Sequence, residues 1–195
     1  MDILHEGRIL TLPGRRLSNL DLFVCRVLDI FTYHSPYVIV SGYVAILFGR
    51  TRTTEDVDLL MPLCGPSTFI PLHDAFIRQG YEFLNAEDGY GLLSILTSGC
   101  AIRLCEKELF IPNIEIKFIK NESDEYSFTH RIPYTVEDKT FWISPLEIQI
   151  AYKFWLGSEK DIEDAIFIRE ISRDFINEDL LSEFCSSFGV RCDPA

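Results

Sequence analysis

The chain has 195 residues, 47% of them hydrophobic and 13% aromatic, and a formal net charge of -12. This length and apolar content suffice for one domain with a buried core, while the negative charge argues against a broad DNA- or RNA-binding surface, which needs many Lys and Arg side chains. No apolar run approaches the roughly 20 residues that span a bilayer, and no signal-like segment opens the chain, so we expect a cytoplasmic protein without a membrane partner.

The first third of the chain predicts a helix, a strand, a short helix and a second strand. Ser18 is followed three residues later by Asp21, a pattern typical of a helix N-cap, and apolar residues then recur at helical spacing until Ser35-Pro36. A buried strand over 37–41 leads into a turn at Gly42. After this turn we expect a short helix over 43–48 that ends at Gly49, and a strand over 56–61.

The middle of the chain predicts a sheet. A helix over 66–79, closed by Gly80, is followed by a strand over 81–85 and a loose segment over 86–91. Further strands are expected over 101–105, 114–120, 131–136 and 139–144, with a polar loop over 121–127.

The character of the chain changes at Ser144. Ser144 and Glu147 flank Pro145 in the arrangement of a capping box with proline at the first helical position. Three helices are expected, over 145–156, 159–171 and 178–188, the last ended by Gly189. We therefore predict an α+β fold, with a mixed α/β sheet core over 1–143 and a helical C-terminal segment over 144–195 that packs on it.

The six cysteines lie among apolar neighbours, and none forms a Cys-x-x-Cys pair of the kind that binds zinc. We expect reduced, mostly buried thiols rather than a metal site or a disulfide framework. These residues are Cys25, Cys64, Cys100, Cys105, Cys185 and Cys192.

Two aspartates stand inside an apolar strand. Asp56 and Asp58 are one residue apart, so both carboxylates point to one face of the sheet. Upstream, the Ser41-Gly42 turn leads from a strand into a helix whose free N–H groups favour an anion. Mg²⁺ commonly takes one or two carboxylates plus substrate phosphates, so this pattern fits a metal-bound nucleoside triphosphate. Glu115 is the best candidate for a third carboxylate, and its alternative is a cross-strand salt bridge.

The stretch SGYVAILFGRTRTTEDVDLLM resembles the signature of the polymerase-beta-like nucleotidyltransferase superfamily, especially its minimal and abortive-infection toxin-type members. In that signature a Gly-Gly or Gly-Ser turn precedes Arg-x-Thr-x-Asp-x-Asp, here Arg52, Thr54, Asp56 and Asp58. A later stretch is similar to the helical segment of such proteins, in which Ser-Pro-x-Glu leads to a lysine and then to Lys-Asp-x-x-Asp. The matching positions are Ser144, Pro145, Glu147, Lys153, Lys160, Asp161 and Asp164.

The resemblance implies a palm-like nucleotidyltransferase fold with a helical C-terminal portion that closes one side of a nucleotide cleft. It assigns catalysis and the binding of two Mg²⁺ ions to Asp56, Asp58 and Glu115. It assigns binding of the nucleoside triphosphate to Ser41, Gly42, Arg52, Thr54 and Lys153. The sequence departs from the family at Glu115, where an aspartate is usual, and at Ser41, where glycine is common.

Some of these side chains have a second interpretation. Arg52 is either a phosphate ligand or a partner that fixes the acidic strand through a bidentate pair. Without the resemblance, Lys153 is a surface lysine that extends its stem over apolar neighbours. We expect Arg50 to be exposed.

The expected activity is Mg²⁺-dependent transfer of a nucleoside monophosphate to a hydroxyl acceptor, which is RNA, a protein or a small molecule. The alternative is a catalytically weak or inactive nucleotide-binding module, such as one half of a toxin-antitoxin pair. A metal-dependent phosphohydrolase is a third hypothesis, because it needs only water in place of the acceptor. Convergence of Glu115 on Asp56 and Asp58 favours the transferase.

Overall fold

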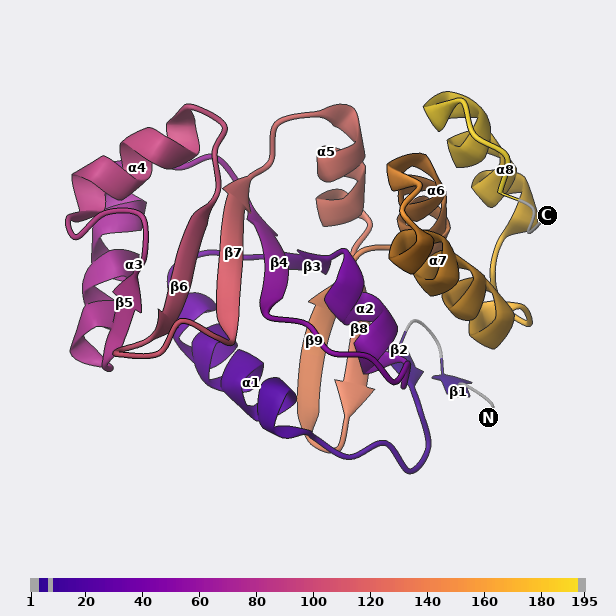
Figure 1. The fold of residues 1–195 in the computed structure, drawn as a ribbon, viewed down its shortest axis with the longest axis horizontal. Coiled ribbons are helices and arrows are strands. Elements are labelled where there is room, and N and C mark those ends of the chain that lie inside the picture. The colour runs from indigo at the N-terminus through magenta and orange to yellow at the C-terminus, as the bar shows by residue number, and fades with distance from the viewer. Residues whose placement is uncertain (1–3, 7–8, 193–195) are drawn as a thin grey trace.

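The computed structural model describes residues 4–6 and 9–192. Within these residues, nine strands form one mixed sheet in the order β1-β2-β8-β9-β3-β4-β7-β6-β5, with eight helices around it (Figure 1). The strands are β1 Leu4–Glu6, β2 Ile9–Thr11, β3 Val38–Val40, β4 Asp56–Met61, β5 Tyr81–Phe83, β6 Ile102–Glu106, β7 Asn113–Phe118, β8 Ile132–Val136 and β9 Lys139–Ile143. The helices are α1 Asn19–Phe31, α2 Gly42–Leu47, α3 Pro66–Arg78, α4 Gly89–Thr97, α5 Glu122–Thr129, α6 Leu146–Leu156, α7 Glu159–Ser172 and α8 Glu178–Phe188.

The centre of the sheet places the acidic strand. β4 runs antiparallel to β3 and parallel to β7, so that Asp58 is paired with Val40 on one side and with Glu115 on the other. Val57, Leu59 and Met61, which point to the opposite face, are at most 1% exposed and belong to the main hydrophobic core. The strand therefore buries one face and presents its carboxylates on the other.

Helices cover both faces of the sheet. α3 contacts both α1 and α4, and all three contribute to the same core as Val57 and Leu59. α5 lies against β3 and β4, and α6 packs on α7 and α8, which gather at one side of the molecule (Figure 1). α7 also touches α2, the helix that follows the Ser41-Gly42 turn. None of the described helices is both long and apolar enough to cross a membrane.

The predicted N-cap of α1 is confirmed. The Ser18 side chain accepts a hydrogen bond from the Asp21 backbone N–H, and the Asp21 carboxylate accepts one from the Ser18 backbone N–H. These two bonds satisfy donors that the first turn of a helix otherwise leaves unpaired.

Two predicted loops are helices instead. The last three residues of the segment expected to be loose over 86–91 begin α4, whose N-cap Asp88 accepts from the Gly91 backbone N–H. The expected polar loop over 121–127 is most of α5, where the Asn121 side chain accepts from Asp124 N–H. α5 buries only Ser127, so it lacks the apolar periodicity that a sequence search detects. Both helices begin after a residue whose side chain caps the first turn.

The predicted capping box at Ser144 is wrong. Pro145 is the N-cap of α6, and no side chain caps this helix. The Ser144 hydroxyl donates to Ser127 Oγ at 3.2 Å, and Glu147 accepts from the Asn177 backbone N–H at 3.0 Å. Both side chains are used in tertiary contacts that the local pattern does not reveal. The ends of α6, α7 and α8 otherwise agree with the prediction within one residue.

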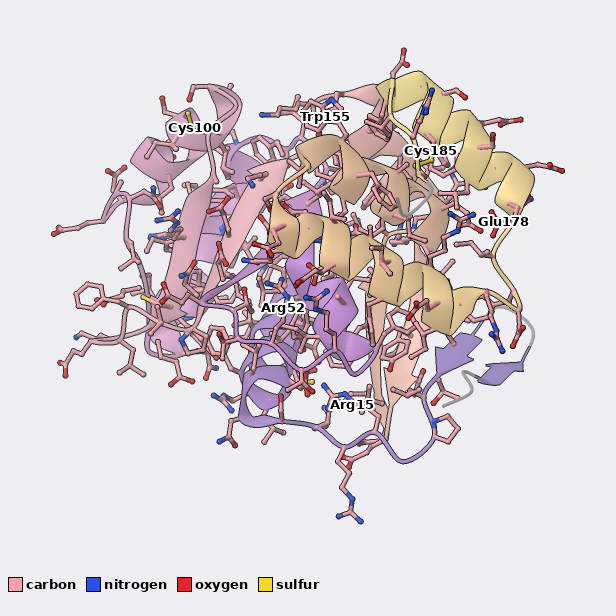
Figure 2. All side chains as sticks on the ribbon, turned by 45° about the vertical axis from the view of Figure 1, so that its right-hand side comes forward. Arg15, Arg52, Cys100, Trp155, Glu178 and Cys185 are labelled. Atoms are coloured by element: carbon pink, nitrogen blue, oxygen red, sulfur yellow. A yellow bond between two sulfur atoms is a disulfide. The ribbon has the colours of Figure 1, made fainter. Side chains whose placement is uncertain are left out.

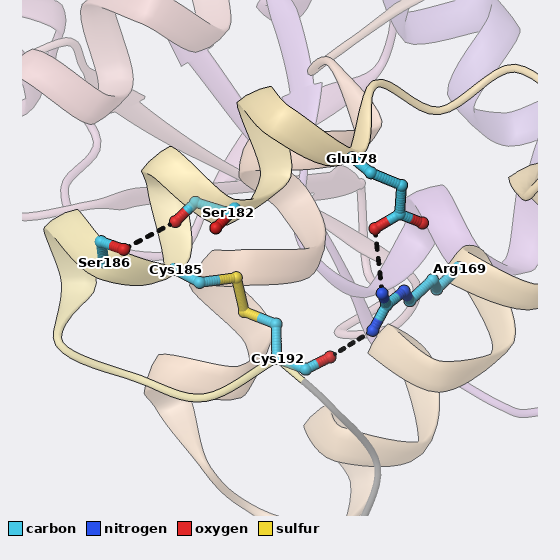
Figure 3. The surroundings of a disulfide bond; sticks show 6 residues. All are labelled: Arg169, Glu178, Ser182, Cys185, Ser186 and Cys192. Carbon is cyan, nitrogen blue, oxygen red and sulfur yellow. Dashed lines mark hydrogen bonds and ion pairs between the residues drawn. A yellow bond between two sulfur atoms is a disulfide. The ribbon is translucent and has the colours of Figure 1, made fainter.

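The cysteine prediction is wrong at one pair, because Cys185 and Cys192 form a disulfide (Figure 3). Gly189, at φ 68°, ends α8 and turns the chain back, which brings the two α-carbons to 6.0 Å. Arg169 fixes the returning segment by donating to the Cys192 carbonyl at 2.6 Å and to Glu178 at 2.9 Å. The remaining four cysteines are free thiols, and Cys100 among them is exposed.

Candidate active site

The three predicted carboxylates lie on one face of the sheet. Asp56 and Asp58 alternate with buried residues along β4, and the register of β4 with β7 places Glu115 next to Asp58. The Thr54 hydroxyl lies 2.9 Å from the Asp56 carbonyl oxygen and 3.2 Å from its Oδ1. Thr54 therefore orients the first aspartate of the pair.

Lys117 joins Asp58 to Glu115. Its Nζ lies 3.1 Å from Asp58 Oδ1 and 2.6 Å from Glu115 Oε1. The other oxygen of Glu115 accepts from Arg103 Nε and Nη2, each at 3.2 Å. The cross-strand salt bridge expected as the alternative for Glu115 is thus present, together with its proximity to Asp58. Lys117 was not among the predicted site residues, although its spacing of two positions from Glu115 puts both side chains on one face of the strand.

Burial and these contacts shift the acid-base properties of the group. Burial raises the pKa of Asp58 above its ordinary value, although Lys117 acts against this effect. Burial alone would raise the pKa of Glu115 too, but hydrogen bonds and charge from Lys117 and Arg103 hold it below its ordinary value. Burial opposes the charge on Lys117, yet Asp58 and Glu115 raise its pKa. At neutral pH, Lys117 is a cation and Glu115 an anion.

A pocket of about 340 Å³ opens on this face, between β3, β4, β7, α5 and α6. Its lining combines polar and aromatic groups, among them Ser41, Asp58, Lys117, Lys120, Gln149 and Tyr152. A larger hollow of about 750 Å³ lies between α1, α3 and β6, and it contains none of the predicted site residues. The smaller pocket is therefore the candidate substrate site.

The Ser41-Gly42 turn is held under backbone strain. Ser41 adopts φ 65° and ψ -141°, a region that side chains other than glycine rarely enter. Gln149 of α6 forms two hydrogen bonds with the Ser41 backbone. Its Oε1 accepts from the Ser41 N–H at 3.2 Å, and its Nε2 donates to the Ser41 carbonyl at 2.8 Å. Nothing in the local sequence around Gln149 predicted this contact between segments over a hundred residues apart.

Arg52 lies between α2 and α7 (Figure 2). Its guanidinium packs against the α-carbon of Gly42, where any Cβ would overlap it, and its Nε is 3.3 Å from Asp164 Oδ1. The carboxylate that Arg52 contacts thus belongs to α7, not to the acidic strand. The closeness of the guanidinium explains why a residue without a side chain follows Ser41.

Lys153 is buried and does not line the pocket. Its Nζ lies 2.7 Å from Asp164 and 3.0 Å from Asp161. Arg50 completes the cluster with Nε 3.1 Å from Asp164, and its side chain is only 16% exposed, so the expectation of an exposed Arg50 is wrong. Three motif residues of α6 and α7, Lys153, Asp161 and Asp164, thus form a cluster with the two arginines of the loop before β4. Lys160 is exposed.

The donor set suits one Mg²⁺ ion better than two. Asp56 and Asp58 offer carboxylate oxygens to an ion whose other ligands come from phosphates and water. Both oxygens of Glu115, however, already bind Lys117 and Arg103. Among the described residues, no group of three His, Cys, Asp or Glu is arranged to hold a metal.

Sequence comparisons find no relative, since neither a protein-family model nor a curated protein matches the chain. Solved structures do resemble it. The crystal structure of ANT(2")-Ia in complex with adenylyl-2"-tobramycin is 13% identical, with a TM-score of 0.55 over 88% of this chain and 98% of that one. The solution structure of the antibiotic-resistance factor ANT(2'')-Ia has the same identity and TM-score, over 86% and 90% of the two chains.

A third similar structure is an antigenic nucleotidyltransferase-like protein from Paracoccidioides brasiliensis. It is 16% identical, with a TM-score of 0.51 over 85% of this chain and 84% of that one. The chain therefore has the polymerase-beta-like nucleotidyltransferase fold, and the predicted mixed sheet with a helical C-terminal portion is confirmed.

Proposed function

We propose that this chain is a Mg²⁺-dependent nucleotidyltransferase that transfers a nucleoside monophosphate from a nucleoside triphosphate to a hydroxyl acceptor. The observation that carries the proposal is the pocket in which the Ser41 turn, Asp58 and Lys117 meet, with Asp56 on the same face of the sheet. The fold supports it, because similar structures include a nucleotidyltransferase-like protein and one complex with adenylyl-2"-tobramycin.

In this proposal Asp56 and Asp58 hold Mg²⁺, which supplies positive charge to the phosphates when bound. Ser41 and Gly42 meet the triphosphate at the turn, and Thr54 keeps Asp56 in place through its hydrogen bond. An acceptor hydroxyl forms a bond to the α-phosphorus while the bond to pyrophosphate breaks. The hydroxyl proton leaves to water as this bond forms, and Glu115, whose two oxygens accept from Lys117 and Arg103, holds Lys117 beside Asp58.

Arg52 and Lys153, both expected at the nucleotide, act here through Asp164. Arg52 packs against Gly42, and Lys153 anchors the same Asp164 carboxylate from α6. This cluster ties α6 and α7 to the turn at the end of β3. We propose that it shapes the phosphate-binding backbone, so both residues affect nucleotide binding without lining the pocket.

The net charge of the chain bears on the class of acceptor. The net charge of -12 favours a small molecule or a protein side chain over a large RNA, because an RNA acceptor needs a basic surface. The catalytically weak module, including a role in a toxin-antitoxin pair, is the alternative. The position of Glu115 beside Asp58 favours the transferase over that alternative.

Thermal unfolding tests the proposal. A triphosphate that binds only the folded protein raises the melting temperature. We expect one or more of the four ribonucleoside triphosphates to stabilise the protein with Mg²⁺, and the Asp56→Ala/Asp58→Ala variant to lose this effect. Asp138→Ala, an exposed residue in the β8–β9 turn, is the matched control and should keep it.

Transfer itself is then measured as release of pyrophosphate with pooled acceptors. If a triphosphate stabilised the protein but no pyrophosphate were released, the protein would be the inactive nucleotide-binding module instead of a transferase. No stabilisation by any triphosphate would overturn the nucleotide site.

A further inference from the structure

One cation already stands between two of the three carboxylates. Lys117 Nζ contacts Asp58 Oδ1 at 3.1 Å and Glu115 Oε1 at 2.6 Å, while Arg103 holds the second oxygen of Glu115. A second metal ion bridged by Asp58 and Glu115 would need the same oxygens that Lys117 binds.

The placement of Lys117 is fixed by the sheet and does not depend on a flexible loop. Lys117 and Glu115 share a face of β7, and Leu60, the residue paired with Lys117, follows Asp58 on the same face of β4. The Lys117 side chain is about one third exposed, and those of Asp58 and Glu115 are exposed by 20% and 14%. The ammonium group is therefore held partly out of water between two anions.

The local charge also favours a single metal ion. Three carboxylates face two cationic side chains, Lys117 and Arg103, so one formal negative charge remains on this face. One Mg²⁺ at Asp56 and Asp58 reverses that charge before the triphosphate arrives. A second divalent ion would meet an ammonium at close range in a partly desolvated site, which Coulomb repulsion opposes.

The geometry points to Lys117 as the substitute for a second metal ion, so that this protein works with one Mg²⁺ and one ammonium group. The inference rests on the proposed function and specifies its site. Lys117 then supplies the positive charge that a second metal ion would supply and offsets negative charge on the attacking oxygen as its proton leaves, with Glu115 holding the ammonium in position. Binding of one metal ion per nucleotide is its distinguishing consequence.

The test counts metal ions directly and needs no turnover. Mn²⁺ is titrated into the protein with the α,β-methylene analogue of the triphosphate that stabilises it most, and free Mn²⁺ is measured by electron paramagnetic resonance. We expect one bound ion per ternary complex in the native protein and two in Lys117→Met, because removing the ammonium frees Asp58 and Glu115 for a second ion.

Lys107→Met is the matched control, since Lys107 is an exposed residue that follows β6 and does not line this pocket. This variant should bind one ion. Circular dichroism checks that Lys117→Met is folded, and Lys117→Gln replaces it if it is not. Two ions in the native protein, or one ion in the folded Lys117 variant, would overturn the inference alone. No bound analogue at all would overturn the proposed function as well.

Discussion

The guanidinium of Arg52 packs directly on the α-carbon of Gly42, so that a Cβ on this residue would overlap Nη2 and lie 3.0 Å from Cζ. Arg52 cannot move freely, because its side chain is only 10% exposed and its Nε faces Asp164. The turn at the end of β3 is thus fixed by a residue ten positions later and by a helix near the C-terminus.

Gly42→Ala should destabilise the protein by about 1–3 kcal/mol, because overpacking displaces Arg52 from Asp164. The cost should shrink when Arg52 is already Ala, since the overlapping group is absent, and a double-mutant cycle measured by urea unfolding gives the coupling. Gly65→Ala is the control, because nothing lies within 4 Å of its Cβ position. Equal costs in both backgrounds would contradict the close packing.

Ser41→Gly should stabilise the fold by about 1 kcal/mol. Ser41 adopts φ 65° and ψ -141°, a conformation that costs a residue with a side chain about 1–3 kcal/mol. Glycine removes this strain, but part of the gain is offset because glycine makes the unfolded chain more flexible. Urea unfolding measures the gain, and nucleotide-dependent stabilisation shows whether the hydroxyl serves the ligand. Ser98→Gly, at an ordinary αR position, should destabilise instead. A loss of stability in Ser41→Gly would show that the turn is not strained.

Lys153→Met should lower the free energy of unfolding by about 3–5 kcal/mol, because it leaves Asp164 buried with one cationic partner fewer. Denaturant unfolding at neutral pH measures this loss. Lys160→Met, on the exposed surface of α7, should change stability by less than about 0.5 kcal/mol. If Lys153→Met kept full stability and lost only nucleotide binding, Lys153 would be a direct phosphate ligand.

Asp21→Asn should cost stability in a pH-dependent way. Burial alone would raise the pKa of Asp21, but hydrogen bonds from Tyr43 and Ser18 and the charge of Arg15 lower it below its ordinary 3.8. The stabilisation is therefore complete above about pH 3.8 and is lost as the pH falls through the lower pKa of the folded state.

We expect a difference of about 1–3 kcal/mol between the native protein and Asp21→Asn at pH 7, and a smaller one at pH 3. Urea unfolding at both values measures it. Asp29→Asn, an exposed residue of the same helix, should cost much less. A difference that grows on acidification would mean that the pKa of Asp21 is raised.

The Cys185–Cys192 disulfide fixes how many cysteines can react with a thiol reagent before and after reduction. The denatured, unreduced chain should react with a thiol reagent at four cysteines and, after reduction, at six. Cys185→Ser/Cys192→Ser should lower stability by about 2–3 kcal/mol, as expected for a short closed loop. Cys100→Ser, an exposed free thiol, should leave stability nearly unchanged. Six reactive thiols without reduction would contradict the pairing.

The sequence by itself determined the acidic strand and the strong helices. The alternation of Asp56, Val57, Asp58 and Leu59 predicts a strand with one polar face, and the Ser18-Asp21 pair caps α1 through contacts only three residues apart. These features depend on contacts between near neighbours in the chain. They were predictable because a period of two residues or a capping box is complete within a few positions.

The tertiary structure decided the rest of the site. Pairing of β4 with β7 brought Asp58 to Glu115 and Lys117, and the packing of α6 and α7 on α2 brought Gln149 to Ser41 and Asp164 to Arg52. These contacts join segments that are 57 to 112 positions apart, so no local pattern encodes them. Such a contact depends on which side chain a distant element brings alongside, and that partner is known only once the chain has folded.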